Sequence, residues 1–460
     1  MAITHTYVDF ATGNDYKGAS FTDGAFTVAD MTLTKAGAFA ASKVNHWLYL
    51  RDNGSGRVTT GYYRIASVTS ADAVVLATSP KSGATDPTDV VCVQHDGTTA
   101  KPWRSVQGAL DLKTRDATNG DQVNIQSDTP QLLAETLSLV TYGTPTLAAP
   151  LVIRGYTTVA NDGGRGAIRA TGAWSVLDAY AVSKGYINVI NIDLSSTTSG
   201  DYWLVRLWTD SQAVRCSLNG VATGGGNITK GLTVMSGSKT LGNSIVGFTG
   251  EGLYTVQAGQ AIMGNYIAMA YSGAGQYGIH LYTTSTDALV VGNIVSVNAL
   301  SGTGIAIAAG VLVLGNALHN RVAGGAIGIY LAARCSVLNN IISGWSAAGG
   351  KAIYLASGYA NQVGYNAFYN NTANYAISGV LDDLTGHDVT LVASPFVDAA
   401  NGDFSLTATA KAALRGVGWP TSYLGAHTNT DGHITIGPIQ YGEAEAGGGG
   451  RRPWLRQHGG

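Results

Sequence analysis

Apolar and polar positions follow a pattern that repeats along the middle of the chain. A short phrase with an asparagine one or two residues before an apolar position occurs six times, at intervals of 22, 28, 23, 24 and 26 residues. The asparagines are Asn243, Asn265, Asn293, Asn316, Asn340 and Asn366. A second phrase, mostly led by glycine, falls between them with a similar period, as in GIHLY from Gly278 and GIYLA from Gly328. Two interleaved signals with one period predict a repeat architecture.

The repeating unit is predicted to consist of strands. Apolar residues in the second phrase lie two positions apart, as Ile279 and Leu281 do, which is strand spacing. All ten prolines lie at or before Pro150 or at or after Pro395. Coils that pair above and below leave no free edge where a residue without an N–H group is tolerated. The sequence therefore predicts an all-β protein built around a parallel β-helix solenoid.

The remaining segments are predicted to flank this solenoid. Residues 1–92 hold short β-type runs between turn signals and predict a small antiparallel β domain. Residues 93–150 predict the entry to the coil, with a short capping helix whose apolar face includes Trp103 and Val106. The solenoid is expected over residues 151–380, an irregular C-terminal cap over 381–440, and a glycine-rich hinge with a basic tail over 441–460.

Two sets of residues are expected to be structural. The six asparagine side chains are expected to form a ladder, bonding to backbone at the same turn of successive coils. Cys216 and Cys335 both lie between an arginine and a serine, and we expect both to point into the coil as small apolar residues.

Composition and charge exclude several partners. Charged residues make up 12% of the chain and the formal net charge is −2, so no general attraction to nucleic acid or anionic lipid is expected. No run approaches 18 consecutive apolar residues, which predicts no membrane insertion. The first residues lack the basic start and apolar core of a secretory signal.

The recurring asparagines resemble the asparagine ladder of right-handed parallel β-helix proteins of the pectate-lyase type. The segment DGTTAKPWRSVQGAL before the coils and SPFVDAANGDFSL after them are similar to phage-encoded β-helix proteins of the virion and tailspike type. The resemblance covers about residues 95–440. It implies a location in the virion and a homo-oligomer, for example a trimer. It implies no catalytic residue, because this fold carries lyases, hydrolases, tailspikes and inert structural proteins alike.

Chemistry on a polysaccharide requires a pair of carboxylates, or Ca²⁺-binding acids with a base. Residues 241–380 contain Glu251 and Asp287 as their only acids, in different turns. Other acids lie in the irregular first coils near aromatic residues: Asp178, Asp193, Asp201 and Asp210, among Trp203, Arg206 and Trp208. A cleft there is one interpretation, and solvated turn residues are the favoured one. The nine histidines lack metal-binding spacing, so we predict no catalytic residue, metal or cofactor.

An outer column of aromatic residues is the main candidate for binding. If Ile279 and its equivalents point inward, the next residue of each coil points outward. The column is then Tyr254, His280, Ala306, Tyr330 and Tyr354. Ordinary stacked surface tyrosines are one interpretation. A contact face for another protein and a binding track for sugar are the functional alternatives.

Taken together, these patterns predict a non-catalytic structural or appendage protein of a phage virion, either a capsid decoration or a tail-associated spike. Other virion proteins are its expected partners. A basic tail is the expected anchor for assembly: Arg451, Arg452, Trp454, Leu455 and Arg456. The alternatives are a tailspike depolymerase, hydrolase or lyase, and a receptor-binding module, both acting on bacterial surface polysaccharide.

Overall fold

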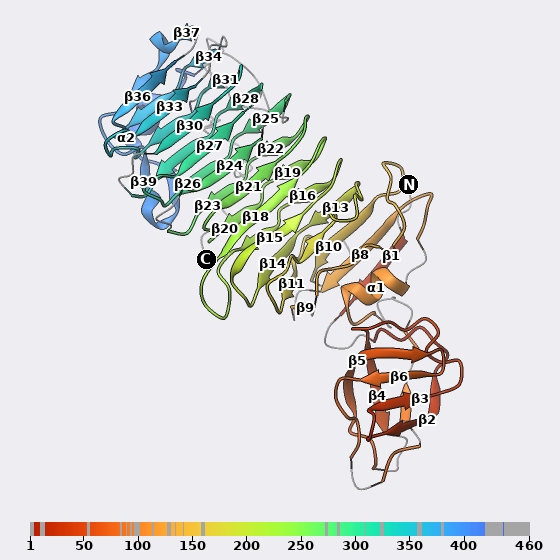
Figure 1. The fold of residues 1–460 in the computed structure, drawn as a ribbon. Coiled ribbons are helices and arrows are strands. Elements are labelled where there is room, and N and C mark those ends of the chain that lie inside the picture. The colour runs from red at the N-terminus through yellow and green to blue at the C-terminus, as the bar shows by residue number, and fades with distance from the viewer. Residues whose placement is uncertain are drawn as a thin grey trace, which may run out of the picture. The chain divides into compact units, whose positions relative to one another are not determined.

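The computed structural model describes residues 4–9, 14–52, 56–82, 85–88, 90–92, 94–95, 102–112, 115–126, 130–133, 135–140, 142–157, 162–271, 275–282, 286–308, 310–322, 326–356, 361–378, 381–418 and 436. Two compact units make up the chain (Figure 1). The first comprises Met1–Thr171 and Tyr186–Asp193, and the second comprises Gly172–Gly185 and Leu194–Gly460.

The first unit contains a closed barrel of six antiparallel strands in the order β2-β3-β6-β5-β4-β7. These strands are β2 (Phe21–Thr27), β3 (Thr32–Thr34), β4 (Trp47–Asp52), β5 (Gly61–Ser70), β6 (Ala73–Leu76) and β7 (Val90–Cys92). Alternate residues such as Leu48, Leu50 and Ile65 fill its core and have no exposed surface. The small antiparallel β domain predicted near the N-terminus is confirmed.

Parallel strands form the rest of the first unit. One sheet runs in the order β1 (Thr4–Val8), β8 (Asp121–Gln126), β10 (Leu151–Tyr156) and β13 (Ile187–Ile190), and β9 (Gln131–Leu133) pairs with β11 (Gly166–Ala170). Strand β1 pairs with β8, so it lies in this sheet and not in the barrel, although the sequence groups residues 1–92 together. Helix α1 (Val106–Leu112) lies within the segment predicted to hold a helix, and Trp103 and Val106 are buried.

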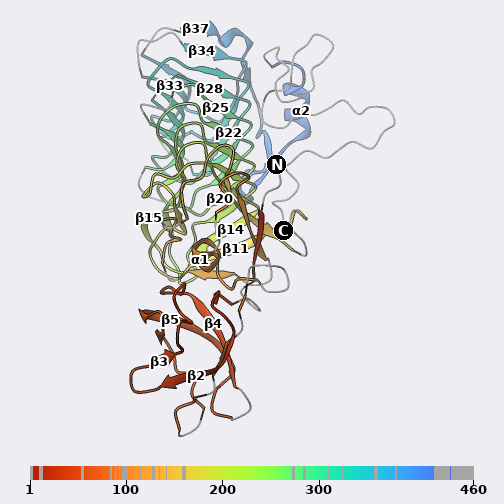
Figure 2. The ribbon, with the colours of Figure 1, turned by 90° about the vertical axis from the view of Figure 1, so that its right-hand side faces the viewer.

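The second unit stacks parallel strands in three sheets, which we name by their total number of strands (Figure 2). Its part of the twelve-stranded sheet is β16 (Gln212–Val214), β19 (Lys239–Leu241), β22 (Ala261–Met263), β25 (Ala288–Val291), β28 (Val311–Leu314), β31 (Ser336–Leu338), β34 (Asn361–Gly364) and β37 (Leu381–Leu384). The eleven-stranded sheet continues through β14 (Ile192–Ser196), β17 (Ser217–Asn219), β20 (Ser244–Val246), β23 (Tyr266–Ala268), β26 (Ile294–Val297), β29 (Ala317–Asn320), β32 (Ile341–Ser343), β35 (Ala367–Tyr369) and β38 (Val389–Thr390). The nine-stranded sheet is β12 (Leu177–Asp178), β15 (Gly200–Arg206), β18 (Ile228–Val234), β21 (Glu251–Thr255), β24 (Tyr277–Leu281), β27 (Thr303–Ile307), β30 (Ile327–Leu331), β33 (Lys351–Leu355) and β36 (Ala373–Ile377).

This arrangement is a parallel β-solenoid of about nine turns, consistent with the right-handed β-helix that the sequence predicts. Each sheet contributes apolar residues of every coil to the interior, such as Ile279, Val290 and Val295, and none of these three has exposed surface. Cys216 and Cys335 are buried as free thiols. Burial raises the pKa of the Cys335 thiol to about 11, so it stays protonated and unreactive at neutral pH.

The asparagine ladder lies at the turn between the twelve- and eleven-stranded sheets. Each ladder asparagine follows a residue with positive φ, for example Gly292 at +65°, and glycine reaches that conformation without steric cost. The Oδ1 atom of Asn293 accepts hydrogen bonds from both the backbone N–H and the Nδ2 of Asn265, each at 2.9 Å. The Nδ2 of Asn293 donates in turn to Oδ1 of Asn316 and to the carbonyl of Ile262, both at 2.9 Å. All six asparagines are buried, so every bond replaces one that water can no longer make.

A carboxylate ends the ladder. Asp388 Oδ1 accepts the backbone N–H of Asn366 at 2.8 Å, and its other oxygen accepts the hydroxyl of Tyr375. At the opposite end, Asn243 Oδ1 accepts the N–H of Cys216 at 2.8 Å.

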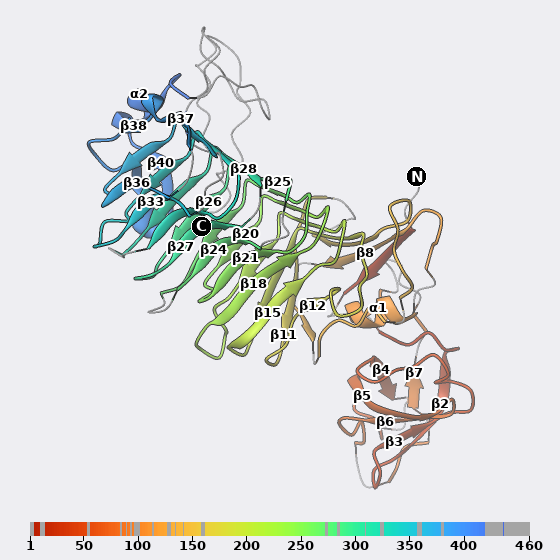
Figure 3. The same ribbon diagram turned by 45° about the horizontal axis from the view of Figure 1, so that its top comes forward.

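The C-terminal segment folds back over the outer surface of the eleven-stranded sheet (Figure 3). It contains β39 (Phe396–Asp398), η2 (Ala399–Asn401), β40 (Asp403–Leu406) and α2 (Ala408–Leu414), whereas η1 (Thr385–His387) lies between β37 and β38. Phe396, Phe404 and Leu406 pack in one buried cluster with Ala317 and Ile341 of the sheet. His319 lies between this segment and the sheet, with ring centroids 6.2 Å from Phe396 and 6.3 Å from Phe404.

We expect Asn293→Ala to lower the free energy of unfolding by about 3 kcal/mol or more, because it leaves several buried donors and acceptors unsatisfied. Urea denaturation measures the change. Asn219→Ala, at the exposed end of β17 where the Asn219 side chain accepts the N–H of Val221, is the control and should cost less than about 1 kcal/mol. A loss at Asn293 as small as the loss at Asn219 would contradict a structural role for the ladder.

His319 should make the folded state sensitive to acid. Burial, with Arg321 nearby, lowers the pKa of His319 from 6.5 to about 4. Between these two values the unfolded chain takes up a proton that the folded chain excludes, so stability is complete above about pH 6.5 and falls toward pH 4, by up to about 3 kcal/mol. Denaturation at pH 7 and pH 4.5 should show a smaller difference in His319→Gln than in the unsubstituted protein. An equal difference in both would disprove the role of His319.

Candidate functional site

The predicted outer column exists as a continuous register on the nine-stranded sheet. Tyr254 pairs with His280, His280 with Ala306, Ala306 with Tyr330, and Tyr330 with Tyr354. The residues before them, such as Ile279 and Ile329, are fully buried, so the column lies on the outer surface. Most strands of this sheet leave both their first and fourth residues at least partly exposed, so a second outer column runs beside the first.

A cluster of aromatic rings surrounds Tyr254 and His280, and we call it the lower cluster. It comprises Trp203, Tyr254, Tyr277, His280 and Tyr282. Trp203 lies 5.4 Å from Tyr254 between ring centroids, and Tyr277 stacks on His280 at 4.5 Å with 20° between the ring planes. Tyr277 and Tyr282 are 36% and 47% exposed, so the cluster presents ring surface to solvent.

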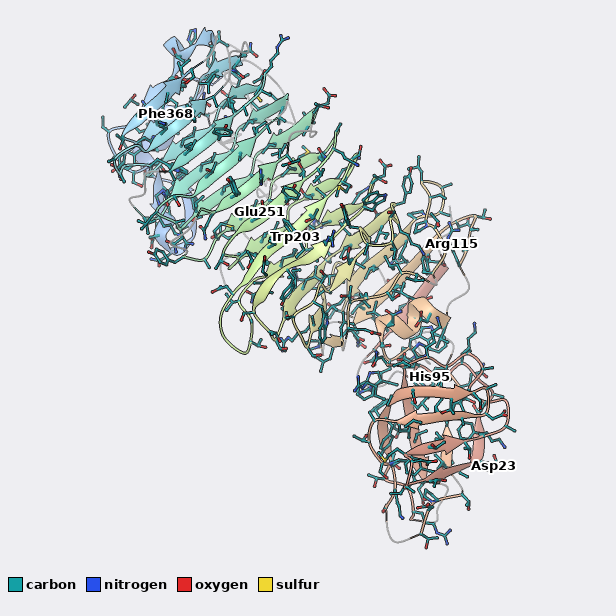
Figure 4. All side chains as sticks on the ribbon, in the orientation of Figure 1. Asp23, His95, Arg115, Trp203, Glu251 and Phe368 are labelled. Atoms are coloured by element: carbon teal, nitrogen blue, oxygen red, sulfur yellow. The ribbon has the colours of Figure 1, made fainter. Side chains whose placement is uncertain are left out.

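Charged side chains are interspersed with these rings. His280 Nδ1 lies 2.7 Å from Oε1 of Glu251, and Lys230 Nζ lies 2.9 Å from Oδ1 of Asp201 and 5.9 Å from the ring centroid of Trp203. Figure 4 shows Trp203 and Glu251 close together on the same face. Burial raises the pKa of Tyr254, and the charge of Glu251 raises it further, so Tyr254 keeps its hydroxyl proton and remains a hydrogen-bond donor.

The first strands of the sheet extend this face. Arg206 Nη1 lies 3.0 Å from Oδ2 of Asp178, and its guanidinium lies 4.1 Å from the ring centroid of Tyr180. Tyr180 in turn packs edge-on against Trp208 at 5.0 Å. Asp178 and Arg206 are register neighbours, and they continue the outer column through Thr233 to Tyr254.

A second, smaller group of rings lies on later coils, and we call it the upper cluster. Tyr330 and Tyr354 have ring centroids 5.6 Å apart, and Lys351 Nζ lies 4.4 Å from the Tyr354 centroid. Ala306, which is 5% exposed, separates the two clusters. From β15 to β33 the face spans six strand spacings, about 29 Å at ~4.8 Å each.

The four acids of the first coils, which the sequence places near one another, lie on different elements of the structure. Asp178 and Asp201 lie on the nine-stranded sheet. Asp193 belongs to β14 of the eleven-stranded sheet and bonds to Arg165 at 2.6 Å, and Asp210 occupies a turn with φ of +53°.

The predicted outer column did not include Trp203, Tyr277 and Tyr282 of the lower cluster, nor the charged side chains of Lys230 and Glu251 beside them. Trp203, Lys230, Glu251 and Tyr277 pair in succession as the second outer column. A search three residues before each column position would have found Glu251 and Tyr277. Trp203 lies three residues before Arg206, which pairs with Thr233 of the outer column, so the same search reaches Trp203 once the column is extended back to Arg206.

The remaining predictions concern the C-terminal tail, metal binding and membrane insertion. The predicted anchoring tail, including Arg451 and Trp454, lies outside the described residues. Among the described residues no three or more His, Cys, Asp or Glu side chains converge in a way that would hold a metal ion. No helix in the described part of the chain is long and apolar enough to cross a membrane.

Comparisons with known proteins return structures of similar architecture. No protein-family model matches the sequence, and a search of curated proteins finds no match. Among solved structures, the Dettilon tailspike protein is 15% identical over 63% of this chain and 64% of its own, with a TM-score of 0.37. A lacto-N-biosidase from Eubacterium ramulus is 11% identical over 62% and 65%, with a TM-score of 0.32.

A third solved structure, XylC in complex with xylose, is 10% identical over 94% of this chain and 83% of its own, with a TM-score of 0.39. The chain thus spans less than two thirds of the first two structures. With identities of 15% or less and TM-scores below 0.5, these likenesses assign no activity to the chain.

Substitutions on the outer face should leave the fold intact. We expect Tyr277→Ala to lower the free energy of unfolding by about 1 kcal/mol or less, since the side chain is partly exposed and contributes surface pairing only. Leu253→Ala, a fully buried residue on the neighbouring strand, should cost about 2–5 kcal/mol. Thermal or urea denaturation compares the two. Equal losses would mean that the outer rings hold the solenoid together.

Proposed function

We propose that the chain is an appendage protein of a phage particle that binds bacterial surface polysaccharide along the outer face of the nine-stranded sheet, without cleaving it. The observation that carries the proposal is the pair of aromatic clusters interspersed with ion-paired side chains. The virion setting and the homo-oligomeric state rest on the sequence resemblance. Attachment through the basic tail belongs to the same proposal.

The chemistry of the face suits a saccharide. A sugar ring has an apolar C–H surface that packs on an aromatic face, and Trp and Tyr combine such a face with a hydrogen-bonding tip. Trp203 and Tyr277 supply rings, while Lys230 and Glu251 supply a donor and an acceptor for hydroxyl groups. Rigid aromatic residues lose little side-chain entropy on binding, so they are efficient contact residues.

The ion pairing and the spacing of the carboxylates favour binding without cleavage. A glycosidase needs one carboxyl group free to protonate the leaving oxygen and a second one as base or nucleophile. Asp178, Asp201 and Glu251 each lie within 3.0 Å of a cationic or basic partner. Asp178 and Glu251 also lie on strands three spacings apart, about 14 Å at ~4.8 Å each, which exceeds the separation of a catalytic pair.

One observation favours a depolymerase as the second candidate. Asp201 and Glu251 lie on β15 and β21, strands that are two spacings or about 10 Å apart, the order of the separation of an inverting pair. Release of reducing ends from a bound polysaccharide, lost in Glu251→Gln or Asp201→Asn, would establish this candidate and refute the non-catalytic one. Asp193→Asn, on the other sheet, should then retain the activity.

If this face binds polysaccharide, removing one of its aromatic rings should weaken that binding. Purified protein should co-sediment with surface polysaccharide from at least one member of a panel of bacteria, and Trp203→Ala or Tyr277→Ala should weaken that binding about tenfold or more. Leu289→Ala, which changes a 41% exposed residue on the twelve-stranded sheet, is the matched control and should bind normally. Equal binding by all three variants would place the binding site elsewhere, and no binding to any member of the panel would refute the function.

A further inference from the structure

We infer that the polysaccharide bound by this face is a neutral one, built from uncharged sugars and not from uronic acids or phosphorylated residues. The inference rests on the proposed function and adds the chemical class of the ligand. It follows from how charge is distributed and compensated on the nine-stranded sheet.

The strands of this sheet carry equal numbers of acids and permanent cations. The acids are Asp178, Asp201 and Glu251, and the cations are Arg206, Lys230 and Lys351. With the whole chain at −2, neither the face nor the protein around it attracts a polyanion over long range.

In the lower cluster and on the first strands of the sheet, each basic side chain also lies beside a carboxylate of the protein. Lys230 contacts Asp201, Arg206 contacts Asp178, and His280 contacts Glu251, all at 3.0 Å or less. A carboxylate on a sugar that approached one of these basic groups would meet a protein carboxylate beside it. The repulsion would offset the attraction, so an acidic sugar gains little here.

Lys351 in the upper cluster has no carboxylate within ion-pair distance among the described residues, and its ammonium lies over the ring of Tyr354. This one cation is too little to select a polymer that carries a charge on every repeat. The paired side chains, by contrast, offer a donor and an acceptor side by side. That arrangement matches neighbouring hydroxyl groups, which both donate and accept hydrogen bonds.

The experiment compares one polysaccharide in two charge states. A neutral polysaccharide that the protein binds is oxidised at its primary hydroxyl groups to carboxylates, and Kd is measured for both forms at low and at tenfold higher NaCl. We expect the oxidised form to bind at least about tenfold more weakly, and Kd for the neutral form to change less than about twofold with salt, since exposed charges are screened by salt and neutral contacts are not. Binding only to acidic members of the bacterial panel, or tighter binding of the oxidised form, would overturn the inference.

A pair of variants tests the mechanism of selection. Asp201→Asn releases Lys230 and should raise the affinity for the oxidised form relative to that for the neutral form by about two- to fivefold, the range expected for an exposed ion pair. Asp23→Asn is matched in net charge and geometry, because Asp23 contacts Lys35 at 2.7 Å with similar exposure, but it lies in the barrel. Equal gains in both variants would overturn local compensation as the cause. Failure of every polysaccharide to bind would instead refute the proposed function, and the inference with it.

Discussion

The repeated hydrogen bond from one asparagine to the next is the interaction on which the solenoid depends. Without it, the sharp turn between the twelve- and eleven-stranded sheets would bury backbone groups that neither strand can pair. The amide suits this position because it both donates and accepts, so one side chain serves the coil before it and the coil after it. Positive φ at the preceding residue, for example +65° at Gly292, gives the chain the direction change that brings each asparagine into line.

The regular turn at each ladder asparagine also determines how side chains stack on the other sheets. Because the turn keeps successive coils in register, residues at equivalent positions stack directly above one another. Residues of one type that recur at an outer position therefore form a column. The aromatic face arises in this way from Tyr254, His280 and Tyr330, which no local structure brings together. The solenoid supplies a regular support, and the chemistry depends on which side chains occupy the two outer columns.

The features that follow from the repeat period could be predicted from the sequence, and the features at irregular positions could not. The strands, the buried asparagines and the outer position of Tyr254 and Tyr354 follow from spacing alone. Trp203 lies before the regular repeat begins, and the register of β15 with β18, which places it near Tyr254, is known only from the structure. The cap over the eleven-stranded sheet was also not predictable in detail, since Phe404 and Ile294 join one buried cluster through tertiary packing between segments that have no common pattern.

The end of the ladder shows how a repeating structure stops. An asparagine at position 388 would present an Nδ2 donor that needs a further coil to receive it. Asp388 accepts from Asn366 and Tyr375 but donates nothing, so no further coil is required. The chain adds one more solenoid strand, β38, and then turns back over the outer surface of the eleven-stranded sheet, where it buries Phe396 and Phe404. Part of that sheet is thereby covered, while Tyr277 on the nine-stranded sheet is 36% exposed.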